Sequence, residues 1–124
     1  MTDHDITERI IGAAIEVHRT LGGPGLLESI YEEALCHEFK NSGLAFQRQV
    51  SCPIRYKGVI LADPLRIDLL VENRIIVECK ATSENNPIYA VQCLTYLRLT
   101  GNLVGLVLNF GHSYMKEGIE RVVT

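Results

Sequence analysis

A chain of 124 residues with 47% hydrophobic side chains and a formal net charge of −3 can form one ordered domain with a genuine core, and is too short to promise a second. Residues 1–124 are therefore expected to form a single domain, and the apolar content argues against a disordered tail. No apolar run approaches the ~20 residues that a helix needs to cross a bilayer, which excludes that class of membrane protein.

Charge is distributed unevenly along the sequence. Residues 1–47 hold eight acidic side chains against three basic ones. Residues 48–80 reverse the balance, with six basic side chains against four acidic ones. A polyanionic partner would therefore meet this second region, although an excess of this size is a weak argument for nucleic-acid binding on its own.

The cysteines and the N-terminal segment indicate the compartment. Cys36, Cys52, Cys79 and Cys93 are irregularly spaced and form no Cys-x-x-Cys pair. The N-terminal segment, MTDHDITERI, is acidic and lacks the apolar stretch of a secretion signal. The sequence therefore predicts reduced thiols in a cytoplasmic protein.

Two helices are predicted at the start of the chain. Apolar residues recur at three- and four-residue steps over residues 6–21, and the run GGPG at residues 22–25 ends that helix. A second helix is expected over about residues 26–41, with Gly43 as its C-terminal cap. Its buried stripe is predicted to comprise Leu27, Ile30, Tyr31, Ala34, Leu35 and Phe39.

Three glutamates lie on the second helix. Glu28 is in its first turn and at the border of the buried stripe, whereas Glu32 and Glu33 are predicted to face solvent. The helix dipole favours an anion in the first turn, so simple helix-end electrostatics already explains Glu28.

The rest of the chain reads as strands and one further helix. Residues 44–54 are strand-like, and residues 56–59 form a turn into a second strand that is interrupted near Asp63-Pro64. Later, Pro87 opens a helix that ends near Thr100. Residues 103–110, LVGLVLNF, predict a strand covered on both faces, and a short last strand is expected at residues 119–123. The fold class is therefore mixed α/β.

Residues 66–80, RIDLLVENRIIVECK, predict a β-hairpin with an apolar face and a charged face, since side chains on a strand alternate. A two-residue turn would pair Asp68 with Val77. A three-residue connection, with a positive φ at Asn73 or its neighbour, instead places Asp68 across from Glu78. The apolar face is expected to hold Leu65, Ile67, Leu69, Val71, Ile75, Val77, Cys79 and Ala81, and the charged face Arg66, Asp68, Arg74, Glu78 and Lys80.

The opposed carboxylates are the first indication of a metal site. Their Cβ atoms would lie about 5 Å apart, so Asp68 and Glu78 repel each other unless a cation lies between them. Carboxylates are hard oxygen ligands suited to Mg²⁺ or Mn²⁺. Lys80 follows in the pattern D-x9-E-x-K and could orient or deprotonate a water molecule and steady the charge of a phosphoryl transition state.

The same residues allow a structural interpretation. Alternating acids and bases decorate many solvated strands, so the E-x-K spacing alone is a weak signal. A purely structural lattice of two ion pairs without any metal, Arg66 with Asp68 and Glu78 with Lys80, is the alternative for the charged face. Cys79 is expected to pack in the core, and His18 is expected to be a structural histidine.

Three motifs together carry a resemblance to known proteins. The order αβββαβ, with an acid on one strand and E-x-K on the next, resembles the PD-(D/E)XK nuclease superfamily. The run Gln92-Cys-Leu-Thr-Tyr96 resembles the Q-x-x-x-Y element of its recombination-exonuclease branch. GLLESIY at residues 25–31 resembles the signature of the small proteins called the GxxExxY family, and the likeness extends through Val17-His18, RIDLL and IIVECKA.

The resemblance implies a restriction-endonuclease-like fold, with a mixed sheet flanked by helices and an extra N-terminal helix before the αβββαβ core. It implies that Asp68 and Glu78 bind Mg²⁺ or Mn²⁺, that Glu28 completes the metal site, and that Lys80 is the catalytic lysine. No proline directly precedes Asp68, where the superfamily pattern has one; Pro64 is four residues back.

Gln92 and Tyr96 would line the pocket and contact the substrate. They are one helical turn apart, so a hydrogen-bonded pair at a helix–sheet contact is the alternative. The function expected from the resemblance is a metal-dependent nuclease that hydrolyses phosphodiester bonds of nucleic acid, with DNA favoured over RNA. The alternative is a binding module that keeps the nuclease fold but lacks turnover or needs a protein partner. Whether the chain forms a homo-oligomer stays open.

Overall fold

Three α-helices and two β-sheets make up the fold, which a computed structural model describes from Met1 to Thr124. The helices are α1 (Asp3–Thr20), α2 (Glu28–Ser42) and α3 (Pro87–Thr100), with a 3₁₀ turn, η1 (Met115–Gly118). The strands are β1 (Phe46–Cys52), β2 (Arg55–Tyr56), β3 (Val59–Ile60), β4 (Leu65–Val71), β5 (Ile75–Lys80), β6 (Val104–Asn109) and β7 (Ile119–Val123). None of the helices has the length and apolar character needed to span a membrane.

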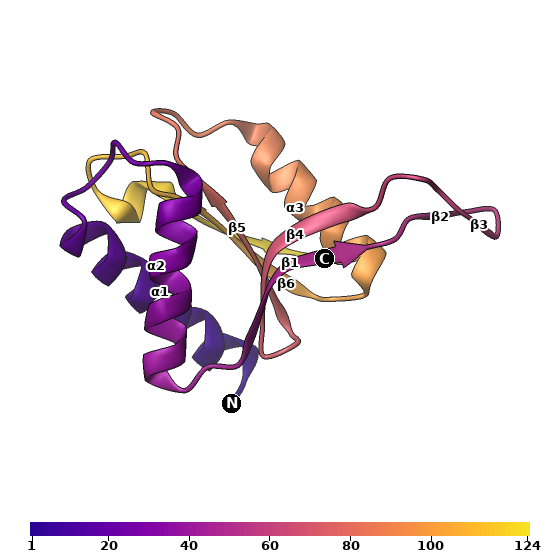
Figure 1. Cartoon of the computed structure of the whole chain (residues 1–124), viewed down its shortest axis with the longest axis horizontal. Helices are drawn as coiled ribbons and strands as arrows, with labels where there is room; N and C mark the ends of the chain where they lie inside the picture. Colours follow the sequence, from indigo (N-terminus) through magenta and orange to yellow (C-terminus); the bar gives the residue numbers. More distant parts are fainter.

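The main sheet has five strands in the order β1-β4-β5-β6-β7, and only the β5–β6 pair is parallel. Figure 1 shows α1 and α2 together on one side of this sheet and α3 on the other side. The long crossover through α3 is what allows β6 to run parallel to β5. Every residue of β6 is buried, as predicted for a strand covered on both faces. The mixed α/β class is confirmed.

Local signals set the helix ends. Thr2 and Asp5 form a capping box, which starts α1 three residues earlier than predicted. Gly43 and Gly101 end α2 and α3 in the left-handed conformation, with φ of 76° and 77°. The Asn86 side chain caps α3 by accepting a hydrogen bond from the Ile88 N–H at 3.0 Å.

The buried face of α2 differs from the prediction. Tyr31, Leu35 and Phe39 are fully buried, but Leu27 is 71% exposed and Ile30 is 41% exposed. Glu32, which was predicted to face solvent, is only 4% exposed. Burial of this carboxylate is possible because Arg48 on β1 forms an ion pair with it, at 2.6 Å from Nε to Oε2. Helical periodicity alone carries no information about such a partner from another strand.

The β4–β5 hairpin has the predicted register. Leu69 pairs with Val77 and Val71 with Ile75, around a connection of three residues. Glu72 and Asn73 in that connection have positive φ angles of 53° and 55°. Extending the register by one residue places Asp68 across from Glu78.

The predicted division into one apolar and one charged face is wrong. Ile75, Val77 and Cys79 face α1 and α2 as predicted, but Ile76 packs with Ile67 on the α3 side. The face predicted to be charged is therefore covered by α3 and has a second, smaller apolar core.

The alternation of side chains is also interrupted at Asp68. Ile67 packs on the α3 side, whereas Leu69 packs on the side of α1 and α2. On the neighbouring strand, Gln49 lies across from Asp68 in the β1–β4 register and has a positive φ of 54°. This distortion lets Asp68 turn away from the regular pleat at the point where the site is built.

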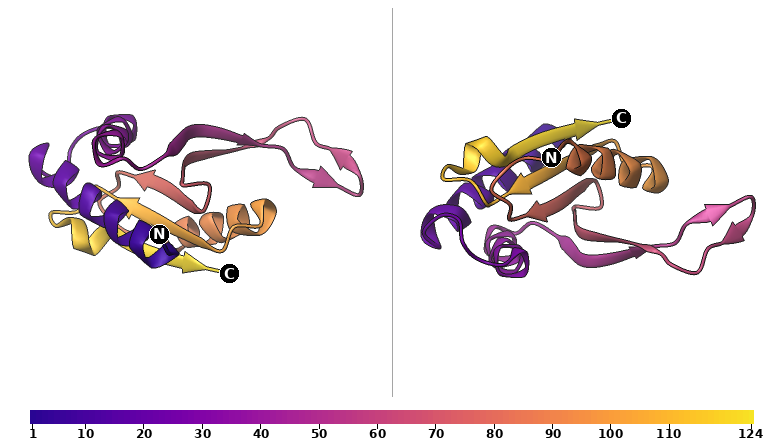
Figure 2. Two further views of the ribbon diagram at one scale, coloured as in Figure 1. Left: turned by 90° about the horizontal axis from the view of Figure 1, so that it is seen from below. Right: turned by 90° about the horizontal axis from the view of Figure 1, so that it is seen from above.

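The β2–β3 hairpin extends from β1 and β4 as an arm that projects well beyond the main sheet (Figure 2). Its turn is at Lys57 and Gly58, which have φ angles of 49° and 81°, within the predicted turn at residues 56–59. All of β2 and β3 is exposed, and so are the basic side chains of Arg55 on β2 and Lys57 in the turn.

Candidate active site

Asp68 and Glu78 meet where the main-chain pairing of β4 and β5 stops. The last backbone pair on this side is Leu69 with Val77. One residue further, Oδ2 of Asp68 accepts the N–H of Cys79 at 2.9 Å, and the N–H of Asp68 lies 3.5 Å from Oε1 of Glu78. Side-chain carboxyl groups thus accept the N–H groups that backbone carbonyl groups would accept in a regular ladder, and each carboxyl group binds the opposite strand. The predicted convergence of these two residues is present.

Glu78 is 5% exposed. Burial raises its pKa to about 9, helped by the negative charge of Asp68 and by a side-chain hydrogen bond between the two carboxyls. Lys80 opposes the shift but does not cancel it. Two carboxylates this close cannot both ionise without a cation, so Glu78 holds a proton at neutral pH. The donor set is therefore two crowded carboxyl groups, which matches the hard oxygen ligands that Mg²⁺ and Mn²⁺ prefer.

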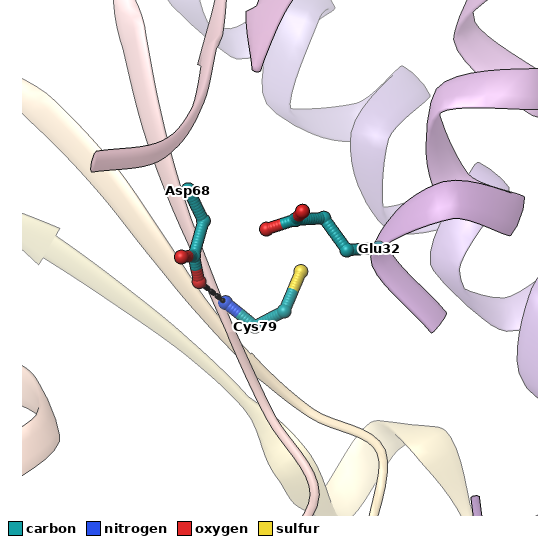
Figure 3. A group of neighbouring side chains, drawn as sticks. All are labelled: Glu32, Asp68 and Cys79. Carbon is teal, nitrogen blue, oxygen red and sulfur yellow. Dashed lines mark hydrogen bonds between the residues drawn. The ribbon is translucent and has the colours of Figure 1, made fainter. Parts of the chain in front are cut away.

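A second group of ligand atoms surrounds Asp68 on the side of α2. Carboxylate oxygens of Glu32 and Asp68 and the sulfur of Cys79 all lie within 4.8 Å of one another. Figure 3 shows the Glu32 carboxylate turned toward Asp68 and the Cys79 thiol pointing toward the Glu32 carboxylate, while the Cys79 N–H binds Asp68. Burial, followed by the charges of Asp68 and Glu32, raises the pKa of Cys79 well above its ordinary value. Cys79 is thus a protonated thiol of the core, as predicted, and a weak ligand in that form.

Glu32 is a site residue that the sequence analysis missed. Besides its ion pair with Arg48, it accepts two hydrogen bonds from Nε2 of Gln49, at 3.0 and 3.1 Å. The same nitrogen lies 3.4 Å from Oδ1 of Asp68. Gln49 thus links Glu32 to Asp68 and helps to fix the orientation of Asp68. The position of Glu32, four residues after Glu28, was a usable signal for its place in the site, because that spacing puts two side chains on one side of a helix.

Glu28 lies at the mouth of the site, at the first turn of α2. It is exposed and shares a shallow pocket with Leu26, Leu27, Ser29 and Ala81, the residue that follows Lys80. Partial burial raises its pKa, while Lys80 lowers it and Asp68 and Glu32 raise it. The charges of the site therefore affect the pKa of Glu28, although its side chain lies at the entrance and not beside the Asp68–Glu78 pair.

Tyr31 fixes the loop that precedes α2. Its hydroxyl donates to the Gly23 carbonyl at 2.7 Å and accepts the Leu26 N–H at 3.2 Å. Its ring stacks on Phe110, with centroids 4.7 Å apart and planes 8° from parallel. In the G-x-x-E-x-x-Y motif, the tyrosine is therefore the residue that holds the helix start, and with it Glu28, against the core.

Lys80 is partly buried on the α3 side of β5, and its ammonium lies over the ring of Tyr89, 4.9 Å from the centroid. Neither ion pair of the lattice interpretation is present: the four ion pairs are Arg19–Glu16, Arg48–Glu32, Arg74–Asp3 and His112–Glu117. The structural alternative for the charged face is therefore wrong, because Gln49 and the Cys79 N–H bind Asp68 instead.

Of the two α3 residues predicted to line the pocket, Tyr96 is the one influenced by the carboxyl groups of Asp68 and Glu78. It is partly buried, and its pKa is raised by burial and then by Glu78 and Asp68. Gln92 is exposed. The hydrogen bond considered between Gln92 and Tyr96 is absent.

Two further sequence predictions concern the cysteines and His18. All four cysteines are free thiols. His18 is 6% exposed and its Nε2 lies 2.8 Å from the His112 carbonyl, which agrees with a structural role.

Of the comparisons with known proteins, the one with protein families gives a match. A family model described as the PD-(D/E)XK nuclease superfamily matches residues 4–122. No curated protein and no solved structure gives a significant match. The mixed five-stranded sheet with helices on both faces is consistent with the restriction-endonuclease-like fold. Because the match covers nearly the whole sequence, this chain belongs to the PD-(D/E)XK nuclease superfamily.

Proposed function

We propose that this protein is a metal-dependent nuclease that hydrolyses phosphodiester bonds in nucleic acid, and that it belongs to the GxxExxY group of the superfamily. The observation that carries the proposal is the meeting of Asp68 and Glu78 where β4 and β5 diverge. A buried carboxyl with a pKa raised to about 9 beside a second carboxyl is costly for a fold to keep unless it serves a cation. The superfamily supports nucleic acid as the substrate.

In this proposal Asp68 and Glu78 hold Mg²⁺ or Mn²⁺, with Glu28 completing the site from its mouth. The cation, when bound, supplies Lewis-acid polarisation of the scissile phosphate. Glu78 would have to give up its proton to hold the cation, since only the carboxylate is a ligand. Glu32 stays paired with Arg48 and orients Asp68 through Gln49.

Lys80 is proposed to be the catalytic residue beside the metal ligands. It is two residues from Glu78 on β5 and makes no ion pair with any carboxylate. An ammonium that is not neutralised by a protein carboxylate can orient the attacking water and stabilise the charge that develops on the phosphoryl group. Tyr96 and Gln92 on α3 are proposed to contact the substrate.

The nucleic acid is proposed to reach the site along the basic side of the β1–β4 region. Arg55 and Lys57 on the β2–β3 arm and Arg66 at its base are exposed. They lie on the β2–β3 hairpin and on β4, which contains Asp68, within a protein of net charge −3. Local positive charge on an acidic protein directs a polyanion to one surface, by attraction of the phosphate backbone. DNA is the substrate we favour.

A cleavage assay with purified protein tests the proposal. Labelled single-stranded DNA, duplex DNA and RNA are incubated with Mg²⁺ or Mn²⁺ and with wild type, Lys80→Ala or the matched control Lys40→Ala, which changes an exposed lysine at the end of α2. Metal-dependent cleavage that is lost in Lys80→Ala and kept in Lys40→Ala is expected. Wild type that binds nucleic acid but never cleaves it would point to the binding module instead, and cleavage unchanged in Lys80→Ala would contradict the site.

A further inference from the structure

The surroundings of Lys80 on the α3 side include an aromatic ring to which the motifs assign no role. Tyr89, in the first turn of α3, places its ring beneath the Lys80 ammonium, 4.9 Å from Nζ to the centroid. A cation over the face of a tyrosine is attracted by the negative face of the ring, and the attraction grows as water is excluded. Both side chains are partly buried. The ring therefore restrains a side chain that would otherwise have several rotatable bonds.

The ring is itself fixed through its hydroxyl. The Tyr89 hydroxyl is 3.2 Å from Oγ1 of Thr82. That oxygen also accepts a hydrogen bond from Nδ2 of Asn109, at 3.1 Å, and donates one to the Glu84 carbonyl, at 2.8 Å. A hydroxyl has one proton to donate and two lone pairs to accept with, so Thr82 is saturated and Tyr89 must be the donor in their bond. This defines the orientation of the tyrosine.

Asn109 anchors the arrangement to the sheet. It is 0% exposed at the end of β6, and its Oδ1 accepts the N–H groups of Thr82 and Gly111, both at 3.0 Å. Gly111 has no space for a side chain, because an added Cβ would lie 2.1 Å from the Thr82 carbonyl oxygen. The N–H of Phe110 binds the Lys80 carbonyl at 2.8 Å. The backbone that carries Thr82 is thus packed closely against the end of β6.

We propose that Tyr89 is a positioning residue for Lys80. Asn109 hydrogen-bonds Thr82, Thr82 accepts the Tyr89 hydroxyl, and the Lys80 ammonium lies over the Tyr89 ring. The ring thereby keeps the ammonium near the Asp68–Glu78 carboxyls and prevents it from forming an ion pair with them. Glu78 and Lys80 are two residues apart on one strand face, about 6–7 Å along the strand, so an unrestrained lysine side chain could reach Glu78 and occupy the place of the cation. This inference rests on the proposed role of Lys80 in hydrolysis.

The position of Lys80 can be measured without any catalytic activity. Aromatic ring currents shift the resonances of CH₂ groups lying over the ring upfield, and the chain has only four lysines, Lys40, Lys57, Lys80 and Lys116. In the ¹H–¹³C spectrum, the Lys80 ε-CH₂ resonance is expected upfield in wild type and returned to the random-coil position in Tyr89→Leu. The matched control is Tyr56→Leu, since the Tyr56 ring lies 5.4 Å from Lys57 Nζ on the arm; it should leave Lys80 unchanged.

Kinetics then test the consequence. Tyr89→Leu should lower kcat by about tenfold or more with KM unchanged, because it misplaces a group that acts on the reacting atoms. Tyr89→Phe keeps the ring but loses the bond to Thr82, so it should keep part of the upfield shift and part of kcat. If Tyr89→Leu fails to fold, Tyr89→Phe takes its place in the test. In that case, a Tyr89→Phe variant that keeps the full upfield shift and the full kcat overturns the proposal.

Three results would overturn the positioning role. One is a Lys80 resonance unchanged in folded Tyr89→Leu. Another is a Tyr89→Leu variant that loses the upfield shift but keeps its kcat, while Lys80→Ala abolishes cleavage. That result would leave the nuclease proposal intact. The third is cleavage that does not depend on Lys80, which would remove the nuclease mechanism and the role of Tyr89 together, even with the ring contact present in the spectrum.

Discussion

Asp68 on β4 and Glu78 on β5 face each other one residue beyond the last backbone pair of their strands, and each carboxyl binds the other strand. A regular ladder would continue here with main-chain hydrogen bonds and would leave no room for a ligand. The two carboxyl groups are instead crowded together in a partly buried place, and no basic side chain forms an ion pair with Glu78. The predictions below follow from this arrangement.

The stability of the metal-free protein should fall as the pH rises. The folded-state pKa of Glu78 is about 9, above its ordinary value of 4.5. Its contribution to the free energy of unfolding is thus fully present below pH 4.5 and is lost as the pH rises through about 9. Glu78→Gln keeps the shape of the side chain and removes its ionisable group, so it should raise the free energy of unfolding by on the order of 2 kcal/mol at pH 8.

Thermal unfolding in chelator at pH 5 and pH 8 measures this effect, with Glu120→Gln on β7 as the control for an exposed glutamate. Glu78→Gln should have a smaller loss of Tm between the two pH values than wild type or the control. Equal losses in all three proteins would contradict the assigned burial of Glu78.

Arg48→Ala should destabilise the fold because it leaves the buried Glu32 carboxylate without its partner. Glu32 is 4% exposed and lies 2.6 Å from Arg48 Nε. Loss of such a partner is expected to cost about 2 kcal/mol, less than the ~3–5 kcal/mol of a fully buried pair, because Arg48 itself reaches solvent. Urea unfolding provides the measurement. Arg19→Ala, which breaks the exposed ion pair with Glu16, should have little effect; equal losses would show that Glu32 is not buried in solution.

Tyr31→Phe should loosen the loop before α2 without emptying the core. It removes the hydroxyl that binds the Gly23 carbonyl and the Leu26 N–H, and it keeps the ring on Phe110. A loss of about 1–2 kcal/mol in the free energy of unfolding is expected from the two broken hydrogen bonds. Amide hydrogen exchange should accelerate at residues 23–28 and not in β6; unchanged exchange in the loop would mean that Tyr31 does not hold it.

Charge reversal on the arm should weaken nucleic-acid binding in a salt-dependent way. Arg55→Glu with Lys57→Glu replaces two exposed cations on the β2–β3 hairpin. The slope of log K against log salt should become less steep by about 2, because each lost phosphate contact removes about one released counterion. Fluorescence anisotropy at several salt concentrations measures it. Val59→Ser at the same hairpin is the control, and an unchanged slope in the double variant would place the nucleic acid elsewhere.

The parts of the fold that could be predicted from the sequence are those set by local chemistry. Gly43 ends α2 as expected, α3 begins at Pro87 and ends at Thr100 as expected, and Asn73 with its neighbour Glu72 takes the positive φ angles that fix the hairpin register. That register is also why the sequence alone places Asp68 across from Glu78.

The parts that could not be predicted depend on partners distant in sequence. Glu32 was assigned to solvent because its partner, Arg48, is on β1. Ile67 was assigned to the wrong face because the distortion at Gln49 and Asp68 interrupts the alternation on which the assignment relied. The place of Tyr89 under Lys80 depends on how α3 packs against β5, and no spacing within α3 reveals it.

The most direct test of the central claim is calorimetric titration of the protein with Mn²⁺ at pH 6, 7 and 8, in buffers of different ionisation enthalpy. The account predicts one cation bound per chain, release of a proton on binding, and affinity that rises with pH because Glu78 must ionise. Asp68→Asn should abolish binding and Glu120→Gln should not affect it. Binding that is absent from wild type at millimolar Mn²⁺, or that survives unchanged in Asp68→Asn, would contradict the claim that these two carboxyls form a metal site.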